Sequence, residues 1–493
     1  MRVTLLNLTS QGIKCSWETP PSRSIPSRRE EFVASPSSAI ETELPRRCQH
    51  ISLRHHLGVT HSASSNSGQG KEQERGQGRG QGQGQEQNVD ASTEVKPAGI
   101  ATRISLTLSA LWHVLDTPKD SPWRVYATKV ARKHYKLTVF LKRDTTSFLS
   151  DIPDTVPLYS LLLPGTHDTM AFYGWPISQC QYPSTPLQSQ LESGIRVIDI
   201  RLALVDNRLI AYHGIYPERT PFSEILETIN AFLTSPSSNR ETIVMSMKQE
   251  DYSRTPPSDW SKAVKREIEE SKGGLGLFFL ENRMPKLGEV RGKVVMLSRF
   301  GGNGDGWEGG LEGLGIHPTT WPDSKKEGFE WDCKGVRVRM HDWYAIPSFL
   351  YIPEKVALAT EILLAPPKED LRPTLSFTYF SAASFPLATP PTIAQGFGWP
   401  KWGLGVEGVN SRVARWLLGI LGGDSSVIKG VTDEGVREKE KLRASTDDGD
   451  EQEPRIRGWA MLDYYSSSEN GLVPLLIECN FRGRKEGEEG WCR

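Results

Sequence analysis

The sequence predicts an α/β fold, a TIM-like (β/α)8 barrel, over residues 150–483. Eight apolar, β-rich runs follow one another through this region, and helix-like amphipathic segments lie between several of them. Such alternation is typical of a parallel barrel or of an open doubly wound sheet. No glycine-rich phosphate turn of the GxGxxG type follows the first run, which disfavours the open sheet.

The predicted strands are short runs rich in branched and aromatic residues. They are Leu158–Leu163, Ile195–Arg201, Leu209–His213, Thr242–Lys248, Lys293–Arg299, Val336–His341, Thr374–Tyr379 and Arg457–Tyr464. The predicted helices carry apolar residues at intervals of three and four, as Pro221–Leu233 does. Further helix-like segments are Trp260–Glu270, Pro353–Leu364 and Val409–Leu421.

The first hundred residues differ in composition from the rest. Gly68–Gln87 is a Gly/Gln repeat without a large apolar side chain. A segment of this kind buries too little apolar surface to offset its conformational entropy. We therefore expect residues 1–100 to be a disordered low-complexity tail, with residues 101–149 as a poorly defined lead-in to the barrel.

Two polar segments lie in or after the predicted barrel. Residues 424–453 are charged and nearly free of large apolar side chains, so we expect an exposed insertion before the last strand. Residues 484–493 form a short polar tail.

The composition of the whole chain excludes several classes of partner. The formal net charge is −1, so no overall field attracts nucleic acid. The six cysteines are scattered without a CxxC pair, which disfavours a disulfide framework or a zinc site. The N-terminus lacks a signal-peptide core, and no apolar run is long enough to predict a membrane-spanning helix. We therefore expect a cytoplasmic monomer.

Ionisable residues stand at the ends of the predicted strands, where a barrel carries its catalytic side chains. They are His167 and Asp168; Asp199 and Arg201; His213; Lys248 and Glu250; Arg299; His341, Asp342 and Tyr344; and Asp463. Burying such groups unpaired would cost several kcal/mol, so the set predicts a polar pocket.

Two histidines beside an arginine suit phosphoryl chemistry. One imidazole takes a proton from an attacking hydroxyl, and the other gives a proton to the leaving oxygen. A guanidinium pairs with the phosphate oxygens and stabilises developing charge. A lone histidine at a strand end is more often structural, so this interpretation depends on the whole set.

Four segments carry a resemblance to a known family: LLLPGTHDTMAF, LESGIRVIDIRLAL, LIAYHGIY and ETIVMSMKQE. In this order they are similar to the X region of phosphatidylinositol-specific phospholipase C. The similarity is closer to the bacterial enzymes than to the calcium-dependent eukaryotic ones. It covers about residues 150–480, with the X-region core at about 155–300.

The resemblance implies a role for each matching residue. It makes His167 the general base toward the inositol 2-hydroxyl and His213 the general acid toward the diacylglycerol oxygen. Asp463 then orients the base, and Asp168 assists the acid. The remaining matches are Asp199 and Arg201 beside the phosphate, and Lys248, Arg299, Asp342 and Tyr344 around the inositol ring.

The implied activity is that of a phosphoric diester hydrolase of the phosphorus–oxygen lyase type. It would cleave an inositol phospholipid to diacylglycerol and inositol (cyclic) phosphate. Two alternatives stay open: a catalytically silent barrel that binds lipid or inositol phosphate, and a phosphodiesterase for another glycerophospho-substrate. The filled catalytic positions disfavour the first.

Arg201 predicts that no metal or other cofactor is used. Calcium-dependent relatives have an acidic metal ligand where this chain has arginine. A fixed guanidinium would repel calcium and would supply the positive charge itself. The alternative is a calcium ion held by Asp199 and Glu250.

A lipid substrate implies peripheral contact with a membrane surface through loops. Residues 396–405 place Trp399 and Trp402 among glycines, and tryptophan favours the headgroup interface. The alternative is that these two rings cap the barrel core.

Overall fold

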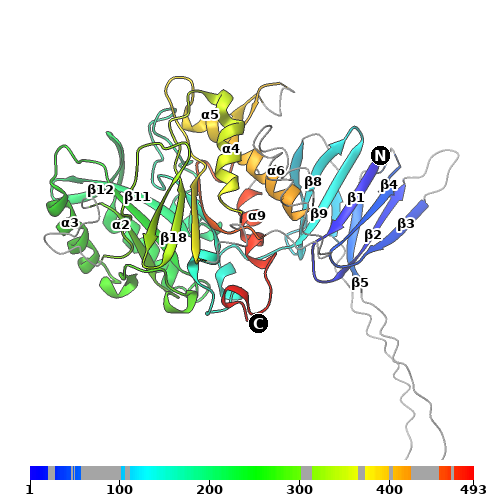
Figure 1. Cartoon of the computed structure of the whole chain (residues 1–493). Helices are drawn as coiled ribbons and strands as arrows, with labels where there is room; N and C mark the ends of the chain where they lie inside the picture. The colour runs from blue at the N-terminus through cyan, green and yellow to red at the C-terminus, as the bar shows by residue number, and fades with distance from the viewer. Residues whose placement is uncertain are drawn as a thin grey trace, which may run out of the picture. The chain divides into compact units, whose positions relative to one another are not determined.

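The computed structural model divides the chain into two compact units (Figure 1). The first comprises Met1–Leu108, Leu115–Tyr126 and Val130–Leu141, and the second comprises Ser109–Val114, Ala127–Lys129 and Lys142–Arg493. The structure describes residues 1–19, 28–45, 48, 50–56, 102–105, 111–300, 314–364, 372–398, 404–423, 455–467 and 471–492. Among these residues, no helix has the length and apolar character needed to cross a membrane.

The first unit is built from β-strands. They are β1 (Arg2–Asn7), β2 (Gly12–Thr19), β3 (Arg28–Ala34), β4 (Ser38–Glu43), β5 (His50–His56), β6 (Thr102–Ser105), β8 (Trp123–Ala131) and β9 (His134–Leu141), while β7 (Trp112–Leu115) spans the sequence boundary between the units. One sheet has the order β4-β1-β9-β8, and another has the order β3-β2-β5-β6. Leu5, Ile13, Leu53 and Val125 are fully buried, as expected where strands turn one face inward.

The prediction of a disordered tail is wrong for the described residues between 1 and 56, which contain β1 to β5. Ile13, Cys15 and Trp17 alternate along β2 and are buried, so short strands supply a core that the average composition hides. The Gly/Gln repeat lies outside the described residues. The expected lead-in is also wrong, because β6, β8 and β9 fall between residues 101 and 149.

A curled sheet of mainly parallel strands forms the centre of the second unit. Seven of them are β10 (Leu162–Thr166), β11 (Val197–Val205), β14 (Ile243–Gln249), β16 (Val294–Arg299), β18 (Val336–His341), β19 (Thr374–Tyr379) and β22 (Gly458–Leu462). Their spatial order is β16-β14-β11-β10-β22-β19-β18, and neighbours in this order are parallel. β15 (Phe278–Phe279) and β17 (Phe329–Cys333) flank the two ends. All seven carboxyl ends therefore lie at one edge of the sheet.

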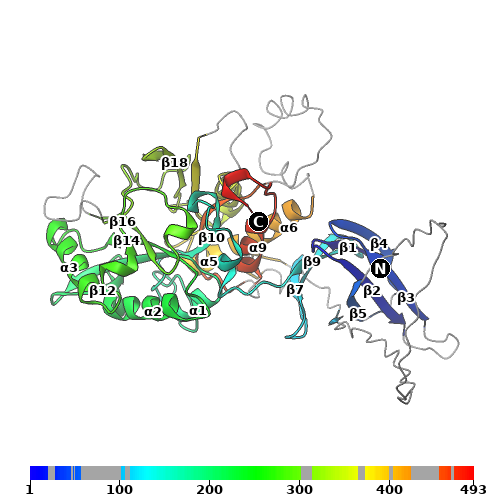
Figure 2. The ribbon, with the colours of Figure 1, turned by 90° about the horizontal axis from the view of Figure 1, so that it is seen from below.

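The helices of this unit pack against the sheet, against its hairpin or against one another. They are α1 (Leu187–Glu192), α2 (Phe222–Thr234), α3 (Pro257–Glu270), α4 (Ile352–Glu361), α5 (Pro390–Gln395), α6 (Val409–Leu421) and α9 (Leu472–Glu478). Short 3-10 helices are η1 (Phe148–Asp151), η2 (Leu158–Ser160), η3 (Leu275–Leu277), η4 (Leu287–Glu289), η5 (Phe349–Tyr351), η6 (Cys479–Phe481) and η7 (Glu488–Gly490), and β20 (Gly396–Phe397) pairs with β21 (Val406–Glu407). Figure 2 shows α2 and α3 beside the strand β12 (Arg208–His213), against which both helices pack.

The expected eight alternating strands are not what the structure contains. β12 pairs antiparallel with β11 and continues into β13 (Tyr216–Pro221), so Leu209–His213 is part of a hairpin and not a barrel strand. Asp206 and Asn207 both have positive φ, the conformation of a two-residue turn that reverses the chain. Within the described residues, no pairing joins the two ends of the sheet.

The other predicted elements agree with the structure to within a few residues at their ends. The main shift is at the first run, where η2 occupies its beginning and β10 starts at Leu162. The expected insertion at 424–453 lies outside the described residues. The polar tail at 484–493 contains η7 and the buried Trp491, which packs edge-on against Phe481.

Leu5→Ala should lower the free energy of unfolding of the first unit by about 2–5 kcal/mol, the usual cost of truncating a buried leucine. This change is measured by unfolding the protein in urea and using protease cleavage within residues 1–56 as the signal for unfolding. Val130→Ala is the control, because Val130 of β8 is 56% exposed. Equal unfolding midpoints for the two variants would contradict a packed core in this segment.

Candidate active site

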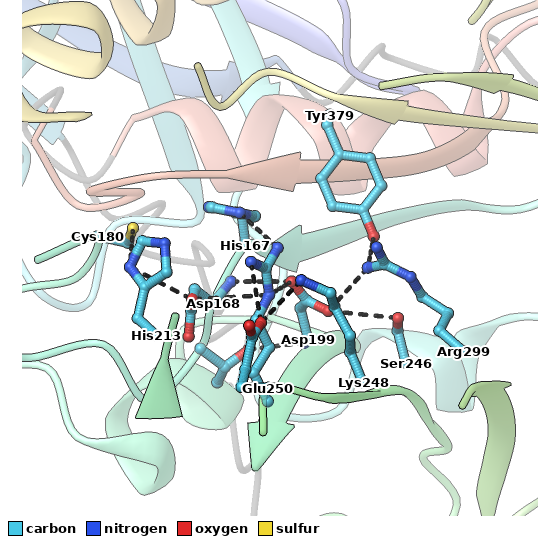
Figure 3. Close-up of polar contacts among 12 residues, drawn as sticks. His167, Asp168, Cys180, Asp199, His213, Ser246, Lys248, Glu250, Arg299 and Tyr379 are labelled. Carbon is cyan, nitrogen blue, oxygen red and sulfur yellow. Dashed lines mark hydrogen bonds and ion pairs between the residues drawn. The ribbon is translucent and has the colours of Figure 1, made fainter. Parts of the chain in front are cut away.

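A cavity of about 810 Å³ opens at the carboxyl ends of the parallel strands. Eight of the ten residues predicted for the site line it: His167, Arg201, His213, Lys248, Arg299, Asp342, Tyr344 and Asp463. Asp168 and Asp199 are buried and contact residues of the lining, as Figure 3 shows. The structure thus brings all ten together, whereas their individual roles stay predictions.

Backbone contacts fix the two strand ends that carry His167 and Asp463. The His167 amide donates to the Leu462 carbonyl at 3.0 Å, and the Gln181 side-chain amide bonds to the carbonyls of His167 and Leu462. From α6, the Asn410 side chain donates to the Asp463 carbonyl at 2.8 Å. The two side chains are therefore held at a set separation.

The His167 imidazole lies between the carboxyl group of Asp463 and the guanidinium of Arg201. Its Nδ1 is 2.8 Å from Asp463 Oδ1, and its Nε2 is 2.7 Å from a terminal nitrogen of Arg201. A guanidinium only donates, so Nε2 accepts and Nδ1 carries the proton that bonds to Asp463. Burial, together with the Arg201 charge, holds the pKa of His167 well below its ordinary range. This imidazole is therefore neutral and basic at Nε2.

Asp199 is buried beside the cavity and accepts hydrogen bonds from four donors. Its Oδ2 accepts from Arg201 Nε at 2.9 Å and from the Asp168 amide at 3.2 Å. Its Oδ1 accepts from Arg299 and from the Ser246 hydroxyl, each at 3.3 Å. Burial alone would raise the pKa of Asp199, but the two guanidinium groups outweigh burial and hold it below its ordinary value. Asp199 is therefore a permanent anion that orients two cations.

The second imidazole, His213, lies across the cavity from the first, with 6.1 Å between ring centroids. Its Nδ1 is 2.6 Å from the Ser178 carbonyl, which can only accept, so Nδ1 carries a proton. Asp168 Oδ2 is 3.4 Å from the same nitrogen. Burial raises the pKa of Asp168 to about 6. A carboxylate there would stabilise the doubly protonated form of His213.

Lys248 and Glu250 form a second charged pair at the end of β14. Lys248 Nζ donates to Glu250 Oε1 at 2.9 Å, and the same oxygen is 3.6 Å from Arg201. Burial and the Arg201 charge lower the pKa of Lys248. Glu250 thus balances part of the positive charge that Arg201 and Lys248 bring to the cavity.

Trp321 and Asp323 line the cavity but were not predicted from the sequence. The Trp321 ring stacks on Arg299, with Cζ 3.8 Å from its centroid, and its Nε1 donates to Asp342 at 2.9 Å. Tyr344 donates its hydroxyl proton to Asp323 at 2.5 Å. Both residues lie in a connection between strands without regular structure, where no periodic pattern marks a functional side chain.

One set of donors among the described residues could hold a metal ion. Ligand atoms of His167, Cys180 and Asp463 lie within 4.8 Å of one another. The set fits a cation poorly, because His167 Nδ1 is already hydrogen-bonded to Asp463 and burial raises the pKa of the Cys180 thiol well above its ordinary value. Asp199 and Glu250, the alternative calcium ligands, are both paired with cations. That the protein uses no metal stays a prediction.

Comparison with known proteins gives matches to phosphatidylinositol-specific phospholipase C enzymes. Residues 167–300 match the family described as phosphatidylinositol-specific phospholipase C, X domain. A 1-phosphatidylinositol phosphodiesterase of Listeria monocytogenes is 36% identical over 167 residues, which are 31% of this chain and 49% of that protein. The match therefore spans about half the length of that relative. The enzyme of the same name from Staphylococcus aureus is 24% identical over 50% of this chain and 77% of its own length.

Solved structures of similar proteins cover about two thirds of this chain. A Staphylococcus aureus phosphatidylinositol-specific phospholipase C has a TM-score of 0.49 at 21% identity, covering 68% of this chain and 98% of that protein. The Listeria monocytogenes enzyme has a TM-score of 0.43 at 22% identity, covering 69% of this chain and 99% of that protein.

Asp168→Asn should stabilise the protein at neutral pH. The pKa of this carboxyl is about 6 when folded, against an ordinary value of 3.8. The folded state therefore binds the proton more tightly, and ionisation of Asp168 costs stability as pH rises through this window. The Tm of the variant should exceed that of the wild type by at least about 2 °C at pH 7.5. The difference should shrink as the pH is lowered to 5.

Thermal melts at the two pH values measure this effect. Glu227→Gln, which neutralises an exposed carboxyl of α2, is the control and should leave Tm nearly unchanged. An Asp168→Asn variant no more stable than the wild type at pH 7.5 would show that its partners stabilise the ionised carboxylate.

Proposed function

We propose that this chain is a phosphatidylinositol-specific phospholipase C-type phosphodiesterase that works without a metal ion. The observation that carries the proposal is a neutral His167, basic at Nε2, beside Arg201 and facing His213 within one cavity. The match of residues 167–300 to the X domain and the names of the bacterial relatives support the same activity. The curled parallel sheet is consistent with a TIM-like barrel arrangement around the cavity.

In the proposed reaction, the two imidazoles exchange protons with the substrate. The inositol 2-hydroxyl gives its proton to His167 Nε2 as its oxygen attacks phosphorus. The bond from phosphorus to the glycerol oxygen breaks, and His213 Nε2 gives that oxygen a proton. The products are diacylglycerol and inositol cyclic phosphate. Asp463 holds His167 in the reactive tautomer, and Asp168 stabilises protonated His213.

Arg201 would neutralise the phosphate in place of a metal ion. Asp199 holds its Nε, so a terminal nitrogen is left near His167 Nε2, where a phosphate oxygen can replace the imidazole as acceptor. An arginine oriented before substrate arrives needs little reorganisation in the transition state. The charge that calcium supplies in other phospholipases is thus part of this chain.

The inositol ring would bind in the part of the cavity that is lined by the ends of β14, β16 and β18. Lys248, Arg299, Asp342 and Tyr344 supply donors and acceptors there, in line with the roles predicted for them. The Trp321 ring fixes both Arg299 and Asp342, so we add it to the residues that shape this part of the site. A catalytically silent binding barrel is less well supported, because binding alone does not require two oriented imidazoles.

Exposed apolar side chains stand on the loops that follow the strand ends. Trp175 is 71% exposed, Ile215 85% and Phe385 69%. They belong to the loops after β10, β12 and β19. Apolar loops beside a phosphodiesterase cavity fit insertion into a lipid surface. Trp399 and Trp402, predicted for this role, lie outside the described residues. The expected monomeric state and cytoplasmic location stay predictions.

His167→Ala and His213→Ala should each lower turnover of phosphatidylinositol by at least about 100-fold, the scale of general acid–base catalysis. The assay measures diacylglycerol and water-soluble phosphate released from phosphatidylinositol vesicles. His56→Ala, at an exposed position of β5, is the control. Near wild-type turnover in either active-site variant would refute the role proposed for that imidazole.

Trp175→Ser and Phe385→Ser should lower activity on vesicles several-fold while leaving activity on a soluble short-chain inositol phosphodiester unchanged. The reason is that they remove apolar surface from the proposed membrane contact and not from the cavity. Val130→Ser provides a matched exposed substitution in β8. Equal losses on both substrates would mean that these rings shape the cavity instead.

A further inference from the structure

One loop of the second unit reaches both the proposed membrane surface and a catalytic imidazole. The loop, residues 172–178, follows β10 and exposes Tyr173, Trp175 and Ile177. Its last residue, Ser178, presents the carbonyl that accepts from His213 Nδ1 at 2.6 Å. This loop therefore supplies one of the contacts that orient the second imidazole, the other being Asp168 at 3.4 Å from the same nitrogen.

A buried carboxylate holds the other end of the loop. Glu218 of β13 has no exposed surface, and its Oε2 accepts from the Tyr173 amide at 2.8 Å. The neighbouring Arg219 places its guanidinium 4.2 Å from the centroid of the Tyr173 ring. His213 ends β12, the other strand of the same hairpin. The hairpin therefore contacts the loop at two points. Glu218 accepts from the Tyr173 amide, and His213 donates to the Ser178 carbonyl.

Burying the ionised carboxyl group of Glu218 is unfavourable, so a purely structural contact at this position would not require an acidic residue. Burial raises the pKa of Glu218 to about 7, and the Asp168 charge adds to the shift while Arg219 opposes it. Neither proposed proton transfer involves this carboxyl. It touches the loop backbone and not the cavity, for it is absent from the residues that line the cavity.

We propose that Glu218 is a positioning residue that fixes the loop 172–178 and thereby keeps the Ser178 carbonyl on His213 Nδ1. This inference rests on the proposed function, in which His213 protonates the glycerol oxygen. The consequence is that the position of the loop and the orientation of His213 are coupled. When the loop contacts lipid and is held by Glu218, His213 has the orientation that protonation of the leaving group requires.

The test uses two substrates that differ only in the leaving group. An alkyl inositol phosphate needs a proton from the general acid, whereas a nitrophenyl inositol phosphate leaves as a stable phenolate without one. Glu218→Ala should lower kcat on the alkyl substrate by about tenfold or more. On the nitrophenyl substrate kcat should fall less than about twofold, and KM should change little on either substrate. Equal losses on both substrates, or no loss on the alkyl one, would overturn the proposal.

Two further variants separate positioning from general damage to the fold. Glu218→Gln keeps a carbonyl that can accept from Tyr173, so it should restore most of the alkyl-substrate activity. Glu267→Ala removes a carboxylate of α3 that accepts from the Leu209 amide at 2.7 Å. Leu209 belongs to the same hairpin as Glu218, so this variant removes a contact of the hairpin but none of the loop. It should leave the ratio of kcat on the alkyl substrate to kcat on the nitrophenyl substrate at the wild-type value. If Glu267→Ala lowered this ratio as much as Glu218→Ala does, the effect would belong to the hairpin as a whole.

NMR titration of the His213 ring keeps this test apart from that of the proposed function. If the wild type cleaves neither substrate, the proposed function fails. The titration of His213 should still shift in Glu218→Ala, and hydrogen exchange at the Tyr173 amide should become faster. Neither should change in Glu267→Ala. An unchanged His213 titration in Glu218→Ala would overturn the positioning role, whatever the activity.

Discussion

The site depends on one buried carboxylate, Asp199. A lone carboxylate buried this deeply would be strongly unfavourable, but four donors satisfy it. They come from the end of β10 and from β11, β14 and β16, so four adjacent strands meet at one anion. In return, Asp199 fixes Arg201 in the orientation that reaches His167 Nε2 and keeps that imidazole neutral. Removing Asp199 would leave two guanidinium groups without their shared partner, and Arg201 without the contact that orients it toward His167.

The predicted fold was right where each strand's own side chains carry the information. The apolar runs of the second unit became strands, and Val409–Leu421 is the helix its spacing predicts. The pattern of Leu209–His213 could not reveal its partner, because pairing depends on the turn at Asp206 and Asn207. The strands of the first unit were missed because a neighbouring Gly/Gln repeat dominated the composition, while the buried positions of β2 are only a few residues.

The location of the site could be predicted because parallel strands bring their carboxyl ends together. His167, Arg201 and Asp463 are far apart in sequence, yet strand order alone places them at one edge. Residues that act through another side chain gave no such signal. Trp321 lies in an irregular connection, and Glu218 is one of several polar residues in β13. Their importance follows only from which atoms they contact, a property of the packed structure that no local pattern contains.

The most direct test of this account is the initial rate of inositol cyclic phosphate release from phosphatidylinositol vesicles during a chelator titration. If the Arg201 guanidinium, held by Asp199, supplies the positive charge beside the phosphate, the wild-type rate should be unchanged by excess chelator and by added calcium. Arg201→Asp, measured in parallel, should be inactive in chelator because the built-in cation is gone. Loss of the wild-type rate in chelator, with recovery on addition of calcium, would show that calcium and not Arg201 supplies the positive charge beside the phosphate.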